Sequence, residues 1–203
     1  MQIEEIREYK KGRRKVLLDD GTAWILYTGE IRDCKLKAGM DISEDVYNNI
    51  EFDILQKRAV KRAMHLLEKM DMTEKKLRDK LLQGEYPESA INEAISYVKK
   101  FHYLDDSRYA ANYVQSYQNV RSQKRIRMDL ISKGVAKETI EQSFAHVYEA
   151  DEQAMISKLL KKKGYHLDTA DTAEKRKIYA FLVRRGFRSE DVLHAMKCSD
   201  YLT

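Results

Sequence analysis

Apolar residues recur every three or four positions along most of the chain. From about residue 54 onward, this spacing is interrupted only by short stretches that contain glycine or polar residues. A 3.6-residue period of this kind is typical of helices that bury one face. The pattern predicts helices over residues 54–70, 73–83, 88–101, 106–119, 122–133, 137–149, 151–163, 172–185 and 189–197.

The helical pattern repeats three times. Stretches that begin at Leu77, Ile126 and Ile178 lie 49 and 52 residues apart. They match at four apolar positions: Leu81, Leu130 and Leu182; Tyr86, Val135 and Phe187; Ile91, Ile140 and Val192; and Ile95, Phe144 and Met196. Repeats of this length bury their apolar faces against their neighbours. We therefore expect a mainly α protein in which three tandem three-helix repeats form an elongated array, with Gly134 and Gly186 ending helices in the left-handed conformation.

Residues before 54 follow a different pattern. Two apolar, β-prone runs, Lys15–Leu18 and Thr22–Tyr27, flank Asp20-Gly21, which suits a turn that needs positive φ. Ser43 can cap a helix that follows. A small β-hairpin element therefore precedes the repeats. The expected domains are an N-terminal β-rich element with a linking helix at 1–53 and repeats at 54–104, 105–149 and 150–203.

Composition adds a charge asymmetry. The net charge is +5, but residues 1–53 carry −3, so the positive excess lies wholly in the helical repeats and suggests a polyanionic partner. No apolar stretch approaches the roughly 20 residues of a membrane span, and the charged start does not resemble a secretory signal. Cys34 and Cys198 are isolated, as expected of reduced thiols. We expect a cytoplasmic protein that makes no membrane contact.

Two consecutive carboxylates stand at the start of the second repeat, in the run FHYLDDSRYA. Asp105 and Asp106 are either a catalytic pair or the start of a helix, where a carboxylate accepts backbone N–H groups and suits the helix dipole. No His, Lys or metal ligand converges on them in the sequence, so the helix cap is favoured. The histidines lack ligand spacing, and nucleotide-binding or nucleophile motifs are absent. We expect no catalytic site, no metal and no cofactor.

The same run carries a family resemblance. The chain resembles the RecX family in an aromatic-Leu-Asp-Asp stretch followed by Arg-aromatic-Ala and in two later glycine motifs. The matching residues are Tyr103, Leu104, Asp105, Asp106, Arg108, Tyr109 and Ala110, then Lys133-Gly134, and then Arg184-Arg185-Gly186-Phe187. One departure is Gln83-Gly84-Glu85-Tyr86, where the glycine comes one residue early.

The resemblance implies a regulatory role. RecX proteins regulate the RecA recombinase, so the chain is expected to bind along the groove of the RecA–single-stranded DNA filament as a monomer. It would span neighbouring protomers and inhibit strand exchange and the filament ATPase, in DNA repair, recombination and the SOS response. Double-stranded DNA is a further candidate partner. The alternative is a direct DNA-binding regulator that uses one repeat as a helix-turn-helix reader.

A basic pair recurs at the same place in every repeat and is the main candidate contact. The pairs are Lys75-Lys76, Lys124-Arg125 and Arg176-Lys177. In the first two repeats the pair follows a plausible cap, Thr73 or Ser122, where cations oppose the helix dipole at a cost of very roughly 0.3–1 kcal/mol each. Function and a merely solvated face are equally good explanations.

Further basic residues extend this candidate surface. With Ile126 facing the core, Arg121, Lys124 and Arg127 are expected to project outward together. Arg184, Arg185 and Arg188 surround another helix end and are candidates for partner or nucleic-acid contact as well. A ladder of Tyr109, Tyr113 and Tyr117 suits base stacking, but packing between repeats is favoured.

The double mutant Asp105→Ala/Asp106→Ala tests the helix-cap interpretation. Loss of a cap should lower the melting temperature, consistent with about 0.5–2 kcal/mol per cap. Thermal unfolding monitored by circular dichroism measures the change. Divalent-metal binding that disappears in the double mutant would instead favour a carboxylate site.

Overall fold

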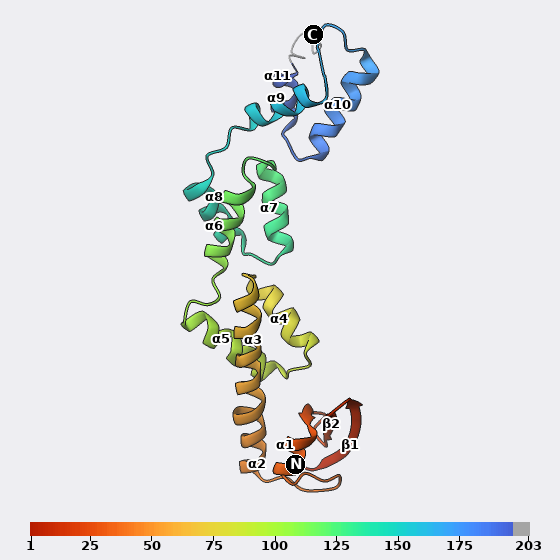
Figure 1. Cartoon of the computed structure of the whole chain (residues 1–203), viewed down its shortest axis with the longest axis vertical. Helices are drawn as coiled ribbons and strands as arrows, with labels where there is room; N and C mark the ends of the chain where they lie inside the picture. Colours follow the sequence, from red (N-terminus) through yellow and green to blue (C-terminus); the bar gives the residue numbers. More distant parts are fainter. Residues whose placement is uncertain (197–203) are drawn as a thin grey trace. The chain divides into compact units, whose positions relative to one another are not determined.

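The computed structural model describes residues 1–196 and divides the chain into two compact units. The first unit is Met1–Asp105, and the second begins at Asp106 (Figure 1). Cys198 and the end of the last predicted repeat lie outside the described residues. Within the described part, no helix is long and apolar enough to cross a membrane.

A three-stranded antiparallel sheet opens the first unit. Its strands are β1 (Ile3–Lys10), β2 (Arg13–Leu18) and β3 (Ala23–Tyr27), in the order β1-β2-β3. The predicted hairpin is confirmed: β2 pairs with β3, and Gly21 takes a positive φ of 85° in the turn between them. β1 was not predicted, because its sequence IEEIREYK is mostly charged and only Ile3 is fully buried.

The sheet leads into an unbroken helical segment. A short helix α1 (Thr28–Asp33) precedes α2 (Glu44–Asn48), which continues through a π-helical segment η1 (Asn49–Gln56) into α3 (Lys57–Lys69). The helix expected at 54–70 therefore begins earlier, at Glu44, where the predicted Ser43 cap accepts a hydrogen bond from Val46 N at 3.4 Å.

The π-helical segment explains why the linking helix after Ser43 and the helix at 54–70 were expected to be separate. Ile50 and Leu55 are both buried although they are five residues apart, a spacing that an α-helical period does not give. Glu51 of the same segment is also buried. Its carboxylate accepts hydrogen bonds from Trp24 Nε1 at 3.2 Å and from the Ser89 hydroxyl, so it joins the strands to the first repeat.

The remaining helices follow the prediction closely. They are α4 (Glu74–Gln83), α5 (Glu88–Lys100), α6 (Asp106–Tyr117), α7 (Gln123–Ser132), α8 (Lys137–Val147), α9 (Glu152–Lys162), α10 (Thr172–Arg184) and α11 (Ser189–Ala195). The matched leucines Leu81, Leu130 and Leu182 are fully buried. The first repeat shares one apolar core with the sheet, whereas the second and third repeats each have a core of their own.

The second helix of each repeat ends in the same kind of turn. In the second and third repeats Gly134 and Gly186 have φ values of 85° and 91°, as predicted. The next N–H donates back to the helix, as from Val135 N to Leu130 O at 3.1 Å. In the first repeat Gly84 is right-handed, and Glu85 takes the left-handed position with φ 60°. The early glycine thus leaves the turn intact but places a side chain where glycine is preferred.

Replacing Glu85 tests this strain. A left-handed residue with a Cβ costs about 1–2 kcal/mol, and glycine loses about 0.5–1 kcal/mol more chain entropy. We expect Glu85→Gly to be more stable than Glu85→Ala by up to about 1 kcal/mol. Both variants lose the contacts of the Glu85 carboxylate with Tyr9 and Lys10, so their difference in denaturant unfolding isolates the backbone. Equal stabilities would contradict the strain.

Candidate functional site

The recurrent basic pairs lie near the start of the second helix of each repeat. Thr73 caps α4 by accepting a hydrogen bond from Lys76 N at 3.3 Å, and Ser122 caps α7 by accepting one from Arg125 N at 3.3 Å. α10 begins earlier relative to its pair and is capped by Asp171. Lys75, Lys76, Lys124, Arg125, Arg176 and Lys177 are all exposed. The two caps expected from the sequence are therefore confirmed.

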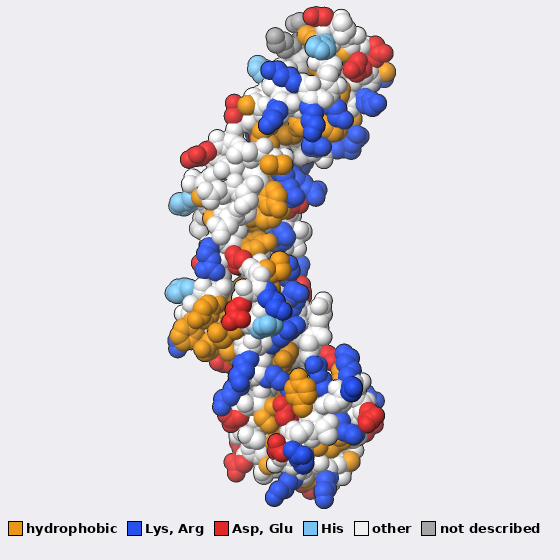
Figure 2. Space-filling model, viewed as in Figure 1, with side chains coloured by type: hydrophobic (Ala, Val, Ile, Leu, Met, Phe, Trp, Pro, Cys, Tyr) orange, Lys and Arg blue, Asp and Glu red, His pale blue; other side chains and the backbone are white. Residues whose placement is uncertain are grey.

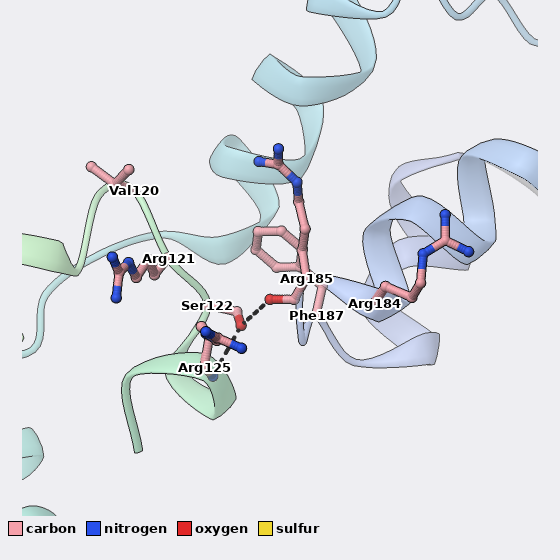
Figure 3. A pocket seen from close by; sticks show the side chains of 7 residues that line it. All are labelled: Val120, Arg121, Ser122, Arg125, Arg184, Arg185 and Phe187. Atoms are coloured by element: carbon pink, nitrogen blue, oxygen red, sulfur yellow. Dashed lines mark hydrogen bonds between the residues drawn. The ribbon is translucent and has the colours of Figure 1, made fainter. Parts of the chain in front are cut away.

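Four of the predicted arginines line one cavity in the second unit. Arg121 and Arg125 come from the start of α7, and Arg184 and Arg185 come from the end of α10 (Figure 3). The cavity has a volume of about 320 Å³ and is also lined by Val120, Ser122 and Phe187. Lys and Arg side chains gather on the surface over these neighbouring helix ends (Figure 2). We call this feature the arginine cavity.

The Ser122 hydroxyl holds the two helix ends of the arginine cavity together. It donates to Arg185 O at 2.8 Å while it accepts from Arg125 N, so it caps α7 and satisfies a carbonyl at the end of α10 (Figure 3). Gly186 makes this approach possible. A Cβ added there would lie 2.6 Å from Ser122 Oγ, so the turn needs glycine for space as well as for its positive φ.

The charge of the arginine cavity is only partly balanced. Asp129 accepts from Arg121 at 2.6 Å and from Arg125 at 3.1 Å. Among the described residues, Arg184 and Arg185 have no carboxylate partner. Asp129 therefore balances part of the charge of Arg121 and Arg125, and the residues that line the cavity keep an excess of positive charge.

Aromatic rings support two of these arginines. The Arg121 guanidinium lies 4.2 Å from the centroid of Tyr117, and that of Arg185 lies 4.6 Å from the centroid of Phe181. The Tyr113 hydroxyl accepts from Arg121 at 2.8 Å. Burial, followed by the charge of Asp129, raises the pKa of Tyr113, so its hydroxyl stays neutral beside Asp129. Such contacts hold the two guanidinium groups in fixed orientations.

Other candidate residues lie apart from the arginine cavity. Arg127 forms a bidentate pair with Glu141 at 2.9 and 3.0 Å and covers the Phe144 ring. Arg121 and Arg127 thus bind different carboxylates, Asp129 and Glu141. Arg188 lines a second cavity of about 270 Å³. Arg176 and Lys177 are two turns from the end of α10, and Lys75 and Lys76 belong to the first unit.

The second cavity has an acidic character. It is lined by Asp151, Glu152 and Asp191 beside Arg188. Glu152 accepts from Gln123 N at 2.6 Å and so joins α9 to the start of α7. Burial raises the pKa of Glu152, and the negative charge of Asp191 raises it further. The hydrogen bond from Gln123 N and the positive charge of Arg188 lower this pKa, but the net shift is upward.

The residues of the family motif divide between the two units. Leu104 is buried in the core of the first unit. Phe101 and Tyr103 are each 49% exposed. Asp106 begins α6, which places Asp105 at the capping position, and Arg108 is exposed.

The other motif residue and the tyrosine ladder belong to the second repeat. Ala110 is fully buried, and Tyr109, Tyr113 and Tyr117 pack on the core of this repeat alone. Packing therefore explains the ladder, as favoured from the sequence, but it is packing inside one repeat.

The sequence did not reveal an exposed aliphatic strip on two of the second helices. Leu82 on α4 and Met128 and Ile131 on α7 are 57%, 54% and 57% exposed. Leu82 and Ile131 occupy matching positions of the repeat, 49 residues apart. Both lie within two turns of a basic pair. On a helical wheel with the core leucines facing inward, these residues fall on the solvent-facing side, where apolar residues stand out.

Comparison with protein families agrees with this organisation. Residues 59–97 match the first three-helix domain of RecX, 105–143 match the second and 150–196 match the third. Together the matches cover more than half of the chain. The chain belongs to the RecX family.

Curated relatives support the same assignment. The Regulatory protein RecX of Clostridium beijerinckii is 25% identical over 95% of this chain and 92% of the relative. That of Caldanaerobacter subterraneus subsp. tengcongensis is 29% identical over 94% and 95%. That of Geobacillus kaustophilus is 31% identical over 77% and 59%. These RecX relatives are named as regulatory proteins.

Two solved structures share the fold. A crystal structure of regulatory protein RecX aligns with a TM-score of 0.66 and 23% identity, covering 98% of this chain and 99% of the other. RecX from Lactobacillus salivarius aligns with a TM-score of 0.61 and 21% identity, covering 72% and 97%. The three-helix repeats and the small sheet are thus an architecture found in other RecX proteins.

Glu152→Gln tests the charge at the junction of the second and third repeats. The raised pKa means that the folded state holds the Glu152 proton more tightly than the unfolded state, so ionisation costs the folded state stability. As pH rises above about 4.5, the wild type should lose stability relative to Glu152→Gln, which keeps an oxygen acceptor for Gln123 N.

Denaturant unfolding across a pH series measures this difference. Glu152→Ala is the matched control, because it lacks both the charge and the acceptor and should be less stable than Glu152→Gln at every pH. If the free energies of unfolding of the wild type and Glu152→Gln change with pH in parallel, ionisation of Glu152 does not destabilise the folded state.

Proposed function

We propose that the protein binds a RecA filament assembled on single-stranded DNA and inhibits its ATPase and recombinase activities. The observation that carries this proposal is the surface of the second helices. All three expose a basic pair, and α4 and α7 add exposed aliphatic residues within two turns of it. Membership of a family of regulatory proteins supports it.

The two kinds of exposed residue suit different parts of one partner. Exposed basic side chains attract phosphates or acidic side chains. Exposed aliphatic residues gain little from nucleic acid, whose apolar surface is its stacked bases, but they are suited to a protein surface. A nucleoprotein filament offers both phosphate and protein along its length, and it repeats, as this surface does.

A sequence-specific duplex reader is less well supported. Such a reader concentrates base-contacting side chains on one recognition helix. Here the candidate contacts are distributed over α4, α7 and α10. Binding of the purified chain alone to one duplex sequence in preference to others would favour this alternative.

Charge reversal of each basic pair tests the proposal. The doubles are Lys75→Glu/Lys76→Glu, Lys124→Glu/Arg125→Glu and Arg176→Glu/Lys177→Glu. Each should weaken inhibition of the RecA filament ATPase by about tenfold or more, since even 1.4 kcal/mol of lost contact changes affinity tenfold. The side chains are exposed, so circular dichroism should show an intact fold.

Uncharged variants separate the protein contribution from the DNA contribution. Met128→Gln/Ile131→Gln should weaken inhibition of RecA without changing the affinity of the chain alone for single-stranded DNA. Met70→Gln is the control, because Met70 is 51% exposed and lies outside α4, α7 and α10. A wild-type chain that leaves the RecA ATPase unchanged would refute the proposed function. If all three charge-reversal variants fold and inhibit the RecA ATPase as the wild type does, the basic pairs are solvated surface residues without a role in binding.

A further inference from the structure

One face of the β1–β2 hairpin carries a charge pattern that the proposed function does not use. The register of the two strands places Arg7 directly opposite Lys15, and Lys10 directly opposite Arg13. Arg13 and Lys15 are two residues apart on β2, so both pairs lie on the same face of the sheet. Like charges directly opposite each other destabilise a sheet. The hairpin therefore holds cations where strand pairing disfavours them.

Protection of the sheet edge explains only part of this pattern. β1 is an edge strand, where charged residues prevent pairing with other chains. β2 is the central strand, so Arg13 and Lys15 protect no edge. The run KKGRRK at residues 10–15 has five cations and no carboxylate. The net charge of −3 over residues 1–53 conceals this concentration, because the acidic residues of that segment lie outside the run.

The first repeat continues the positive charge beyond the sheet. Arg13 and Tyr86, which lies in the turn after α4, line the same small cavity. Burial raises the pKa of Tyr86, and the positive charges of Arg58, Arg62 and Arg13 act against this shift. Arg58 is neutralised by Glu30, whose carboxylate oxygens accept from it at 3.1 and 2.9 Å. Arg62 is exposed and adds its charge beside the sheet.

Carboxylates balance only part of this charge. We use the name basic face for Arg7, Lys10, Lys11, Arg13, Lys15 and Arg62. Glu5 lies 3.9 Å from Arg7, and Glu85 lies 4.0 Å from Lys10. The other four cations have no carboxylate partner among the described residues. Figure 2 shows Lys and Arg side chains gathered over the end of β1.

The make-up of the basic face favours duplex DNA as a partner. The core of a protein interface is depleted in charge, whereas clustered Lys and Arg are typical of nucleic-acid contact. Tyr27 is exposed beside Arg13, but the guanidinium groups of Arg13 and Arg58 already lie over its ring at 5.2 and 5.0 Å. Single strands gain affinity by stacking on aromatic rings, whereas a duplex has stacked bases and a denser row of phosphates.

We propose that the basic face binds the phosphate backbone of duplex DNA without sequence preference. The inference goes beyond the proposed function, which concerns a filament on single-stranded DNA, and it gives the N-terminal sheet a contact of its own. Cations on one side of a strand recur about every 6.6 Å, so β1 and β2 present two short rows of charge to the phosphates that border a groove.

Two double variants of the full chain test the basic face. Lys11→Gln/Lys15→Gln removes two cations from the hairpin, and Arg13→Gln/Arg62→Gln removes two where the sheet meets the first repeat. Binding to a fluorescein-labelled duplex is measured by anisotropy across a salt series. Each lost phosphate contact should lower the log–log salt slope by about 0.9, and each double should bind about tenfold more weakly or worse near 0.1 M salt.

The matched control is Lys35→Gln/Lys37→Gln. It removes the same charge from exposed positions of the first unit. These residues precede Gly39, whose N–H donates to Ile3 O at the end of β1 away from the hairpin turn. The control should keep the wild-type slope. Circular dichroism checks that all three doubles fold.

Two further DNA ligands define the partner. A second duplex of unrelated sequence should bind the wild type with the same affinity as the first, and an oligothymidylate should bind the wild type and both basic-face doubles with the same slope. An equal loss of slope on the oligothymidylate would assign the face to single strands and overturn the duplex. Folded doubles that bind the duplex with wild-type affinity and slope would overturn the basic face itself, and a loss of RecA inhibition in those doubles would assign it to a protein contact.

Failure of the basic face and failure of the proposed function give different results. The RecA ATPase assay on single-stranded DNA contains no duplex, so both basic-face doubles should inhibit as the wild type does. A wild type that binds duplex DNA through the basic face but leaves the RecA ATPase unchanged would contradict the proposed function alone.

Discussion

The structure depends on the turn that ends the second helix of each repeat. One residue in the left-handed conformation reverses the chain, returns a backbone N–H to the buried end of the helix and lets the third helix pack on the same core. In the third repeat this turn also brings the end of α10 against the start of α7. The geometry of the second unit, including its arginine cavity, therefore follows from a backbone conformation that glycine adopts at low cost.

Several basic residues lie at positions where the helix dipole disfavours positive charge. Cations at the start of α4 and α7 oppose the helix dipoles, and side-chain caps from Thr73 and Ser122 offset part of that cost. Where an arginine is needed for structure, it has a partner, as Arg127 has in Glu141. Arg184 and Arg185 have no carboxylate partner among the described residues, and this distinction between paired and unpaired arginines needs the three-dimensional contacts.

Much of the fold was predictable from the sequence because the repeats agree with one another. Helix spans from α4 to α11 followed from apolar period and capping residues, and the β2–β3 hairpin followed from Asp20-Gly21. β1 was missed because its buried face is small, and the continuity of the helix from Glu44 to Lys69 was missed because a π-helical segment changes the period at Ile50 and Leu55. The candidate site was predictable only as a list of basic residues. Which of them meet depends on the contact between Ser122 and the Gly186 turn, which residues 63 positions apart make and which no local pattern records.

The unbroken helix from Glu44 to Lys69 makes the first repeat less independent than the second and third repeats. Its first half covers the sheet and its second half belongs to the first repeat, with Glu51 bonded to both. A truncation before residue 54 would cut through that helix and uncover one side of a shared core. The second and third repeats have closed cores and resemble interchangeable modules. Loss of the sheet would therefore destabilise the first repeat more than the second or the third.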